Sequence, residues 1–117
     1  MVKVDIDLRA QDFAVRVIKM VCSFPKNPAA YIIGKQIIRS ATSIGANITE
    51  AQGGLTKNEF IHSMNIAKKE AKETEYWTNL IIKTSLIKEN RVKSLLKENK
   101  EIIGILTTII VNSKKRK

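Results

Sequence analysis

The chain has very little of the residue types that build catalytic and metal sites. Its 117 residues include 1 histidine and 1 cysteine, His62 and Cys22. A zinc site needs several imidazole or thiolate ligands, and a nucleophile needs a neighbouring base. His62 has Glu59 one turn before it but no second imidazole, so we expect a solvent-facing or capping histidine. The sequence therefore predicts no enzyme, no metal site and no cofactor.

The single cysteine and the lack of a long apolar run restrict the cellular setting. Cys22 cannot form a disulfide within the chain, which fits a reducing compartment, and its apolar neighbours favour a buried, inert thiol. The first residues, MVKVDIDLRA, are charged, unlike a signal peptide. The run from Ile102 to Val111 has about ten residues, whereas a membrane-spanning helix needs about 20. We expect a cytoplasmic protein that does not contact membranes.

Glycine and proline are also scarce, with 5 and 2 copies, so long loops are not expected. Pro25 and Pro28 mark one break, because proline cannot continue the hydrogen-bond ladder of a helix. Gly53-Gly54 marks a second break. Gly45 lies inside a predicted helix, where glycine costs about 1 kcal/mol relative to alanine. We therefore expect the backbone of another helix to approach Gly45 closely.

Apolar residues, by contrast, are plentiful and recur at helical spacing in four segments. We predict helices over residues 9–24, 29–52, 56–85 and 90–112. The third begins with the capping box Thr56-x-x-Glu59 and continues as a heptad seam that ends at Ser85. We interpret residues 1–8 as an N-terminal arm or the lead-in to a helix, and residues 113–117 as a basic tail. The short connections predict one all-α domain over residues 1–117, an antiparallel up-down-up-down four-helix bundle.

The apolar surface of the first and fourth predicted helices is broader than one helix face requires. Val15 and Ile18 add a second apolar row to the first helix, and Ile105 and Val111 broaden the fourth. Large exposed apolar patches usually mark interfaces. We therefore expect the chain to associate with copies of itself.

Acidic residues are few, because 11 Asp and Glu stand against 21 Lys and Arg, a net charge of +10. This surplus favours contact with RNA or DNA. Arginine, the usual residue for bidentate base recognition, is scarce, so we expect phosphate contacts with little sequence readout. The alternative is a protein–protein interaction scaffold whose lysines only keep it soluble. The candidate contacts are Lys68, Lys72, Lys83, Arg91, Lys93, Lys97, Lys114, Lys115, Arg116 and Lys117.

A stripe of polar side chains accompanies the second and third predicted helices, at spacings that share a helix face. We expect a structural polar network formed by Arg39, Ser43, Asn47, Glu50, Glu70 and Glu73. In this interpretation Arg39 and Asn47 pair with carboxylates at the helix interface, and loss of one partner of a buried pair costs about 3–5 kcal/mol. An Arg–carboxylate ligand site and a solvated face are the alternatives. Trp77 is expected to pack on the core flank, with its indole N–H on a carbonyl or carboxylate.

Two sequence motifs resemble a known family. The run from Gly34 to Gln52, GKQIIRSATSIGANITEAQ, resembles the LRSxTSIGANxxEA signature of bacterial four-helix-bundle proteins. The runs IAKKEA, from Ile66, and ETEYW, from Glu73, resemble that family's KEAxETxYW segment. The family is that of the proteins encoded in 23S rRNA intervening sequences, and the resemblance covers nearly the whole chain.

The resemblance implies an all-α bundle with no attached enzymatic activity, assembled as a ring that is typically a homopentamer. The family also resembles the accessory variability factor of diversity-generating retroelements, which the resemblance implies is a basic pentamer that binds nucleic acid and a reverse transcriptase. RNA, DNA and a reverse transcriptase or other protein are therefore the partners that the resemblance implies. The family's recurring polar positions fall on the six network residues. Thr78 departs from the usual leucine, which would loosen the seam, and Ser63 replaces a common lysine, which would remove one charge from the nucleic-acid surface.

Overall fold

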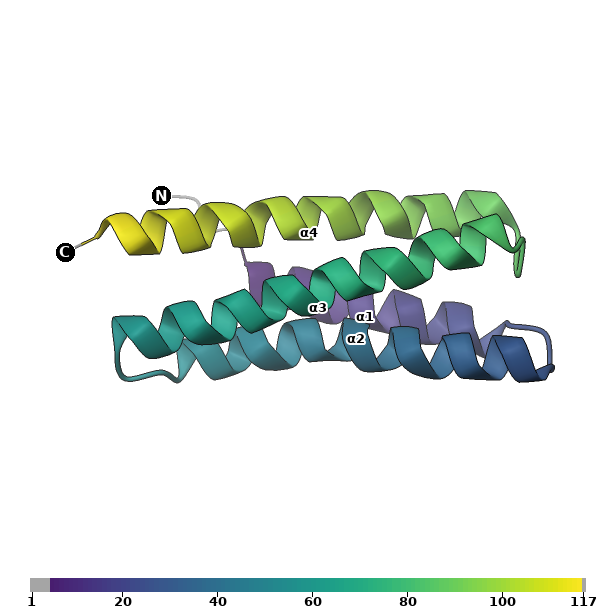
Figure 1. Cartoon of the computed structure of the whole chain (residues 1–117), viewed down its shortest axis with the longest axis horizontal. Coiled ribbons are helices and arrows are strands. Elements are labelled where there is room, and N and C mark those ends of the chain that lie inside the picture. The colour runs from purple at the N-terminus through teal and green to yellow at the C-terminus, as the bar shows by residue number, and fades with distance from the viewer. Residues whose placement is uncertain (1–4, 117) are drawn as a thin grey trace.

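The computed structural model describes residues 5–116 and contains four helices. They are α1 (Ile6–Cys22), α2 (Pro28–Gln52), α3 (Lys57–Lys83) and α4 (Glu89–Lys115). Figure 1 shows them side by side, with successive helices running in opposite directions. The predicted all-α four-helix fold is confirmed. No helix within residues 5–116 combines the length and the apolar content needed to cross a bilayer.

The helices form a ring in which each packs against two neighbours. The interface between α2 and α3 is the most extensive and that between α1 and α4 the least. Large side chains such as Phe13, Met20 and Ile102 fill the core. On α3 the predicted seam is built from small side chains, and Ala67 and Ala71 are completely buried. Small residues at these positions let α3 approach α2 and α4 closely.

Polar side chains in the core form hydrogen bonds mainly with backbone carbonyl groups of the helices. The Thr78 hydroxyl donates to the Thr74 carbonyl of the same helix at 2.7 Å. Thr74 Oγ1 lies 2.8 Å from Ser40 Oγ of α2. Asn99 Nδ2 donates across the helix interface to the Ala71 carbonyl at 3.0 Å. The departure from leucine at Thr78 is therefore accommodated by a hydrogen bond within α3.

Three of the helices begin at a side chain that accepts a hydrogen bond from the first turn, whose N–H groups have no partner within the helix. Asp5, Asn27 and Thr56 each accept from the backbone N–H three residues later, at 3.2, 2.8 and 3.1 Å. The helix start predicted from the Thr56 capping box is confirmed.

The ends of the chain differ from the prediction. Because Asp5 caps α1, the helix begins at Ile6, and residues 6–8 are helical rather than part of an arm. α4 continues to Lys115, so residues 113–115 are helical rather than a tail. Residues 1–4 and Lys117 lie outside the described residues, and there the arm and tail stay predictions.

α3 ends in a Schellman motif with a serine in the left-handed position. Ser85 has a φ of 53°, and its N–H donates to the Ile82 carbonyl at 3.1 Å. The next N–H, that of Leu86, donates to the Ile81 carbonyl at 3.2 Å. The chain therefore leaves the helix before Ser85, and the prediction that placed this exposed residue in the heptad seam is wrong.

Val21 packs so tightly against Gly34 that no side chain fits there. A Cβ atom added at Gly34 would lie 2.7 Å from Val21 Cγ1, whereas one added at Gly45 would lie 3.6 Å from the Ala10 Cβ, an ordinary contact. Packing against α1 therefore requires a glycine at position 34 but not at Gly45, and the prediction that a close backbone approach requires Gly45 is wrong.

α1 is the shortest helix, with 17 residues against 25 to 27 in the others. Arg9, near its start, pairs with Glu98 and Glu101 in the middle of α4. α4 therefore extends beyond α1 by about 16 Å, at 1.5 Å per residue. Figure 1 shows α1 beginning well inside the bundle, whereas α3 and α4 reach its end.

Candidate nucleic-acid interface

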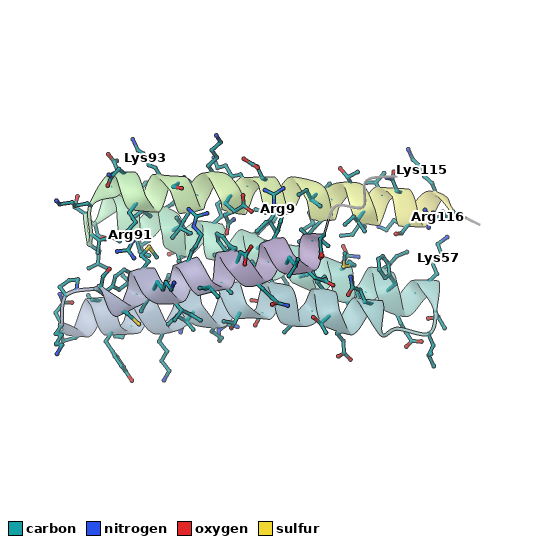
Figure 2. The ribbon with its side chains drawn as sticks, turned by 180° about the vertical axis from the view of Figure 1, so that it is seen from behind. Arg9, Lys57, Arg91, Lys93, Lys115 and Arg116 are labelled. Atoms are coloured by element: carbon teal, nitrogen blue, oxygen red, sulfur yellow. The ribbon has the colours of Figure 1, made fainter. Side chains whose placement is uncertain are left out.

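Most of the candidate basic residues lie at the two ends of α4. Figure 2 shows Arg91 and Lys93 at one end of the bundle and Lys115 and Arg116 at the other. Along the helix axis Arg91 and Lys115 are about 36 Å apart. Between Lys97 and Lys114, residues 98–101 include Glu98, Lys100 and Glu101, and residues 102–113 carry no charged side chain. The predicted basic surface is therefore divided into two clusters.

The first, the Arg91 cluster, lies where α3 ends and α4 begins. It consists of the exposed residues Lys83, Arg91, Lys93 and Lys97. Arg91 Nη1 donates to Ser23 Oγ at 3.1 Å, which holds the guanidinium beside the end of α1. Lys93 Nζ lies 3.5 Å from Glu89 Oε2 in an exposed pair. Because such a pair contributes little, Lys93 can exchange this carboxylate for a phosphate.

The second, the Lys115 cluster, joins the end of α4 to the start of α3. It consists of the exposed residues Lys57, Lys114, Lys115 and Arg116. Lys57 Nζ donates to the Arg116 carbonyl oxygen. The negative end of the α4 dipole favours cations at this position. Lys57 was missed from the sequence, although the antiparallel order of the third and fourth helices places the start of one beside the end of the other. Lys117 lies outside the described residues.

The remaining candidates, Lys68 and Lys72, lie in the middle of α3. Lys72 is exposed, but Lys68 is half-buried, so part of its aliphatic stem covers neighbouring side chains. Lys100 of α4, which the sequence did not single out, lies 3.9 Å from Glu75 of α3. These lysines extend the positive surface between the clusters but do not form a third cluster.

Carboxylates are concentrated on the opposite edge of α4, along its seam with α1. Arg9 donates to Glu98 Oε1 at 2.7 Å and to Glu101 Oε1 at 2.9 Å. The hydrogen bonds from these two glutamates raise the pKa of Arg9. Since its charge is already shared between two carboxylates, Arg9 is a structural arginine and not a phosphate contact.

The predicted polar network is smaller and more exposed than expected. Arg39 pairs with Glu73, and its Nη1 lies 3.8 Å from Glu70 Oε1. The Arg39 side chain is 52% exposed, against 17% for Glu70 and 34% for Glu73. The prediction of a buried Arg39 pair is therefore wrong, because the long side chain reaches the carboxylates from the solvent side of α2.

The other three network residues do not join this cluster. Asn47 Nδ2 donates to the Ser43 carbonyl at 2.8 Å, and the Ser43 hydroxyl donates to the Arg39 carbonyl at 2.8 Å. Both side chains thus bond to their own helix, and the predicted pairing of Asn47 with a carboxylate is wrong. Glu50 is exposed, and within the described residues no ion pair includes it.

Trp77 belongs to the same cluster, and its indole N–H donates to a carboxylate, as predicted. Trp77 Nε1 donates to Glu73 Oε2 at 3.1 Å. This hydrogen bond, and then the one from Arg39, lower the pKa of Glu73 below its ordinary value. The cluster joins α2 to α3, and the alternative of an Arg–carboxylate ligand site is weakened because both carboxylates already face Arg39.

Three further residues can be compared with their predictions. His62 is exposed, as expected. Cys22 is exposed rather than buried, because the helical period places it on the face of α1 opposite the core. Ser63 is 8% exposed, so the serine itself lies beneath the open basic surface. Within residues 5–116 no three His, Cys, Asp or Glu side chains are grouped to hold a metal ion.

Comparisons with known proteins agree with the fold and the motifs. The sequence profile of the 23S rRNA-intervening sequence protein family matches residues 3–108. The crystal structure of a protein of unknown function from the S23 ribosomal protein family of Bacteroides thetaiotaomicron is 39% identical in sequence and superposes with a TM-score of 0.84. The match covers 90% of this chain and 97% of that one. Among curated proteins no sequence matches the chain. With both motifs, the profile and the superposed fold in agreement, the chain belongs to the family of 23S rRNA-intervening sequence proteins.

Proposed function

We propose that this protein is a non-catalytic, self-associating four-helix bundle of the cytoplasm that binds RNA or DNA through phosphates. The observation that carries the proposal is the spacing of the two exposed basic clusters along α4, with Lys93 and Lys115 about 33 Å apart on one face of the helix. One turn of B-form duplex is about 34–36 Å long. The Arg91 and Lys115 clusters can therefore contact phosphates one turn apart on the same side of a duplex.

The chemistry of both clusters favours non-specific binding. Each is dominated by lysine, which offers a mobile point charge and no planar fork for base edges. The uncharged stretch between the clusters, residues 102–113, offers no long polar side chain that could read a groove. Binding would then be driven by release of counterions from the nucleic acid.

Self-association is supported by a second apolar stripe on α1. One face of this helix is buried in the core through Phe13, Val17 and Met20. The opposite face exposes Leu8, Val15, Ile18 and Cys22, which the helical period places in one row. Burial of this stripe against another copy would remove apolar surface from water, and a ring such as the homopentamer that the family resemblance implies would repeat the basic clusters around its axis.

Binding to labelled DNA duplexes of increasing length tests the nucleic-acid proposal. A duplex of about 16 base pairs spans one turn and reaches both clusters, whereas one of about 6 base pairs reaches a single cluster. We expect fluorescence anisotropy to show clearly tighter binding of the longer duplex after correction for the number of sites. The logarithm of the affinity should fall linearly with the logarithm of the salt concentration.

Charge-removing variants locate the contacts. Arg91→Ala with Lys97→Ala, and Lys114→Ala with Lys115→Ala, should each lower the salt slope by about 2, that is by about 1 per lost phosphate contact. The matched control is Lys35→Ala, an exposed lysine on α2 outside both clusters, which should leave the slope unchanged. Equal slopes in all variants, or no retention of an unrelated RNA at about 50 mM salt, would contradict the proposal.

The second candidate is a protein–protein interaction scaffold, with a reverse transcriptase as the partner class that the family resemblance implies. Exposed aromatic and aliphatic side chains away from α1 favour it, because Tyr31 is 71% and Ile32 58% exposed, and tyrosine is enriched at interface hot spots. This candidate gains if RNA and DNA fail to bind at low salt while the lysine variants, still folded, become less soluble.

A further inference from the structure

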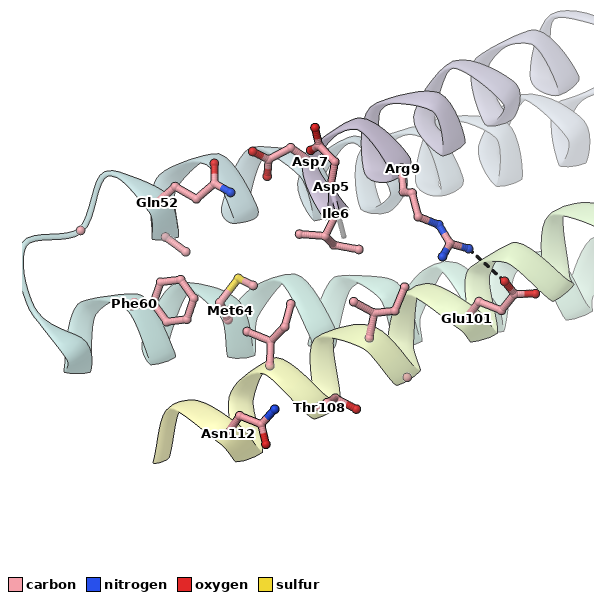
Figure 3. A pocket seen from close by; sticks show the side chains of 15 residues that line it. Asp5, Ile6, Asp7, Arg9, Gln52, Phe60, Met64, Glu101, Thr108 and Asn112 are labelled. Carbon is pink, nitrogen blue, oxygen red and sulfur yellow. Dashed lines mark hydrogen bonds and ion pairs between the residues drawn. The ribbon is translucent and has the colours of Figure 1, made fainter. Parts of the chain in front are cut away.

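The early start of α1 leaves a groove at one end of the bundle. Past the N-terminal end of α1 the described residues supply only α2, α3 and α4, and beside them lies an open groove of about 1470 Å³. Figure 3 shows the first residues of α1 at its mouth, Phe60 and Met64 of α3 along one wall, and Thr108 and Asn112 of α4 along the other.

The floor of the groove is apolar. Phe60, Ile105 and Ile109 line it and are each half-buried. Ile105 and Ile109 are four residues apart and so lie on one face of α4. α1 does not extend far enough to cover them. The groove therefore presents core-type side chains of two helices that lack the packing partner present in the rest of the bundle.

The rim of the groove is acidic, which is unusual for a chain of net charge +10. Among the described residues that line it, Asp5, Asp7 and Glu101 accompany one cation, Arg9. Arg9 is already paired with Glu98 and Glu101, so the charges of Asp5 and Asp7 are uncompensated by it. Asp7 Oδ1 is buried and accepts no hydrogen bond within the described residues.

Gly104 leaves the α4 wall of the groove smooth. It lies inside α4, and a Cβ atom added to it would meet nothing within 4 Å. An interior glycine costs about 1 kcal/mol relative to alanine, and no neighbour within the described residues requires its small size. Glycine at this place lets the surface of an occupying helix approach the α4 backbone.

The geometry points to a docking site for one basic amphipathic helix of a partner protein, seated in the groove as a continuation of α1. A helix about 10 Å across and about 16 Å long has a volume of about 1300 Å³, which matches the groove. Its apolar face would cover Phe60, Ile105 and Ile109, and a lysine or arginine on its flank would lie beside the carboxylates of Asp5 and Asp7. The acidic residues lie at the α1 end of the groove, whereas the Lys115 cluster lies at the ends of α3 and α4 that wall it, so the basic flank of the helix would face Asp5 and Asp7.

A synthetic peptide tests the site directly. The probe is an amphipathic helix of about four turns with leucine at i, i+3, i+4 and i+7, flanked by lysines and labelled with fluorescein. Its counterpart carries glutamate in place of each lysine. We expect saturable one-to-one binding of the lysine peptide to the full chain in anisotropy titrations. The glutamate peptide should bind at least about tenfold more weakly, because it places like charges beside the rim.

Two pairs of variants test whether the peptide binds in the groove. Gly104→Trp fills the groove and should weaken binding at least about tenfold, whereas Gly104→Ala, which meets no atom, should bind normally. Asp5→Asn with Asp7→Asn removes rim charge but keeps a good helix cap, and should weaken binding about tenfold. The matched control Asp12→Asn, an exposed acid of α1 outside the groove, should have no effect.

Several results would overturn the proposal. They are the absence of saturable binding, equal binding of the glutamate peptide, and unchanged binding to the Gly104→Trp variant with its helix content intact by circular dichroism. Binding that occurs only after removal of residues 1–4 would assign the groove to the chain's own first residues. Conversion of an assembly to a monomer by Gly104→Trp in sedimentation would assign it to a second copy.

Discussion

At the scale of single residues, the Arg39–Glu70–Glu73 cluster shows how solvent exposure reduces the contribution of an ion pair to the free energy of unfolding. A buried charge that loses its partner is costly, whereas an exposed pair contributes about 0–1 kcal/mol. Arg39 is 52% exposed, so solvent screens its interaction with both carboxylates. The cluster therefore joins α2 to α3 without dominating the stability of the bundle.

We expect Arg39→Ala to lower the free energy of unfolding by about 1 kcal/mol or less. Urea denaturation monitored by circular dichroism measures this change, with Lys35→Ala as the control for loss of an exposed cation on the same helix. A loss of about 3–5 kcal/mol would instead indicate a buried, desolvated pair.

The hydrogen bond from Trp77 to Glu73 gives stability a pH dependence. The folded state lowers the pKa of Glu73 below its ordinary value of 4.5, so the unfolded state binds more protons in that range. The contribution of this carboxylate is complete above pH 4.5 and is lost as the pH falls through the lower pKa of the folded state. We expect Trp77→Phe to raise the pKa of Glu73 and to reduce this loss.

Carboxyl carbon shifts of Glu73, followed by NMR during acid titration, measure the pKa directly. Melting temperatures across the same pH range report the linked stability. In a Glu73→Gln background the Trp77→Phe change should leave the acid dependence as it was. An unaltered pKa of Glu73 in the Trp77→Phe variant would contradict the assigned cause.

At the scale of elements, helix ends are decided by local hydrogen bonds as much as by apolar periodicity. The cap at Asp5 extends α1 toward the N-terminus, and the Schellman motif at Ser85 ends α3 before its apolar pattern does. Periodicity reports which face of a helix is buried, but it does not report where the backbone leaves the helix.

We expect Ser85→Gly to stabilise the protein by about 1 kcal/mol, because glycine adopts a positive φ without the clash of a Cβ atom. This corresponds to a rise in melting temperature of about 4 °C. Ser113→Gly is the contrasting change, since Ser113 lies within the last turns of α4, where glycine is unfavourable. A lower melting temperature for Ser85→Gly would contradict the left-handed assignment.

Two glycines inside the helices differ in their surroundings, because Gly34 is tightly packed whereas Gly104 faces open space. We expect Gly34→Ala to destabilise the bundle, because the new Cβ would lie 2.7 Å from Val21 Cγ1 and valine is stiff at this bond. Gly104→Ala meets no atom, so we expect it to stabilise by about 1 kcal/mol. Thermal unfolding of the two variants measures both effects, and a shift of the same sign in both would refute this distinction.

At the scale of the whole molecule, the bundle places its charges and its apolar surface on different parts of a rod 51 Å long. The basic clusters lie at the two ends of α4, the second apolar stripe follows α1, and the acidic groove lies where α1 is missing. Three kinds of surface can thus act without competing for the same residues.

The stripe on α1 leads to a prediction about assembly. We expect Val15→Lys with Ile18→Lys to shift sedimentation toward a monomer, because two charges cannot be buried between apolar faces without a large cost. Ile32→Lys, on α2, is the control. Labelling of the exposed Cys22 thiol should slow as the protein concentration rises, and a concentration-independent monomer with constant labelling would exclude this interface.

The sequence by itself determined the number of helices, their buried faces and the family. Apolar residues at helical spacing specify a buried stripe whatever the neighbour, and a capping residue acts within four positions of the chain. The seam of α3, the cap at Thr56 and the partner of the Trp77 indole were predictable for this reason, because each depends on nearby residues.

Only the tertiary structure decided which distant side chains meet. The exposure of Arg39, the tight contact at Gly34, the place of Lys57 beside Arg116 and the groove beyond α1 all depend on the relative shift of helices along the bundle. That shift is set by the summed packing of many side chains, and a displacement of one turn, about 5.4 Å, would change every such contact while leaving the apolar pattern intact.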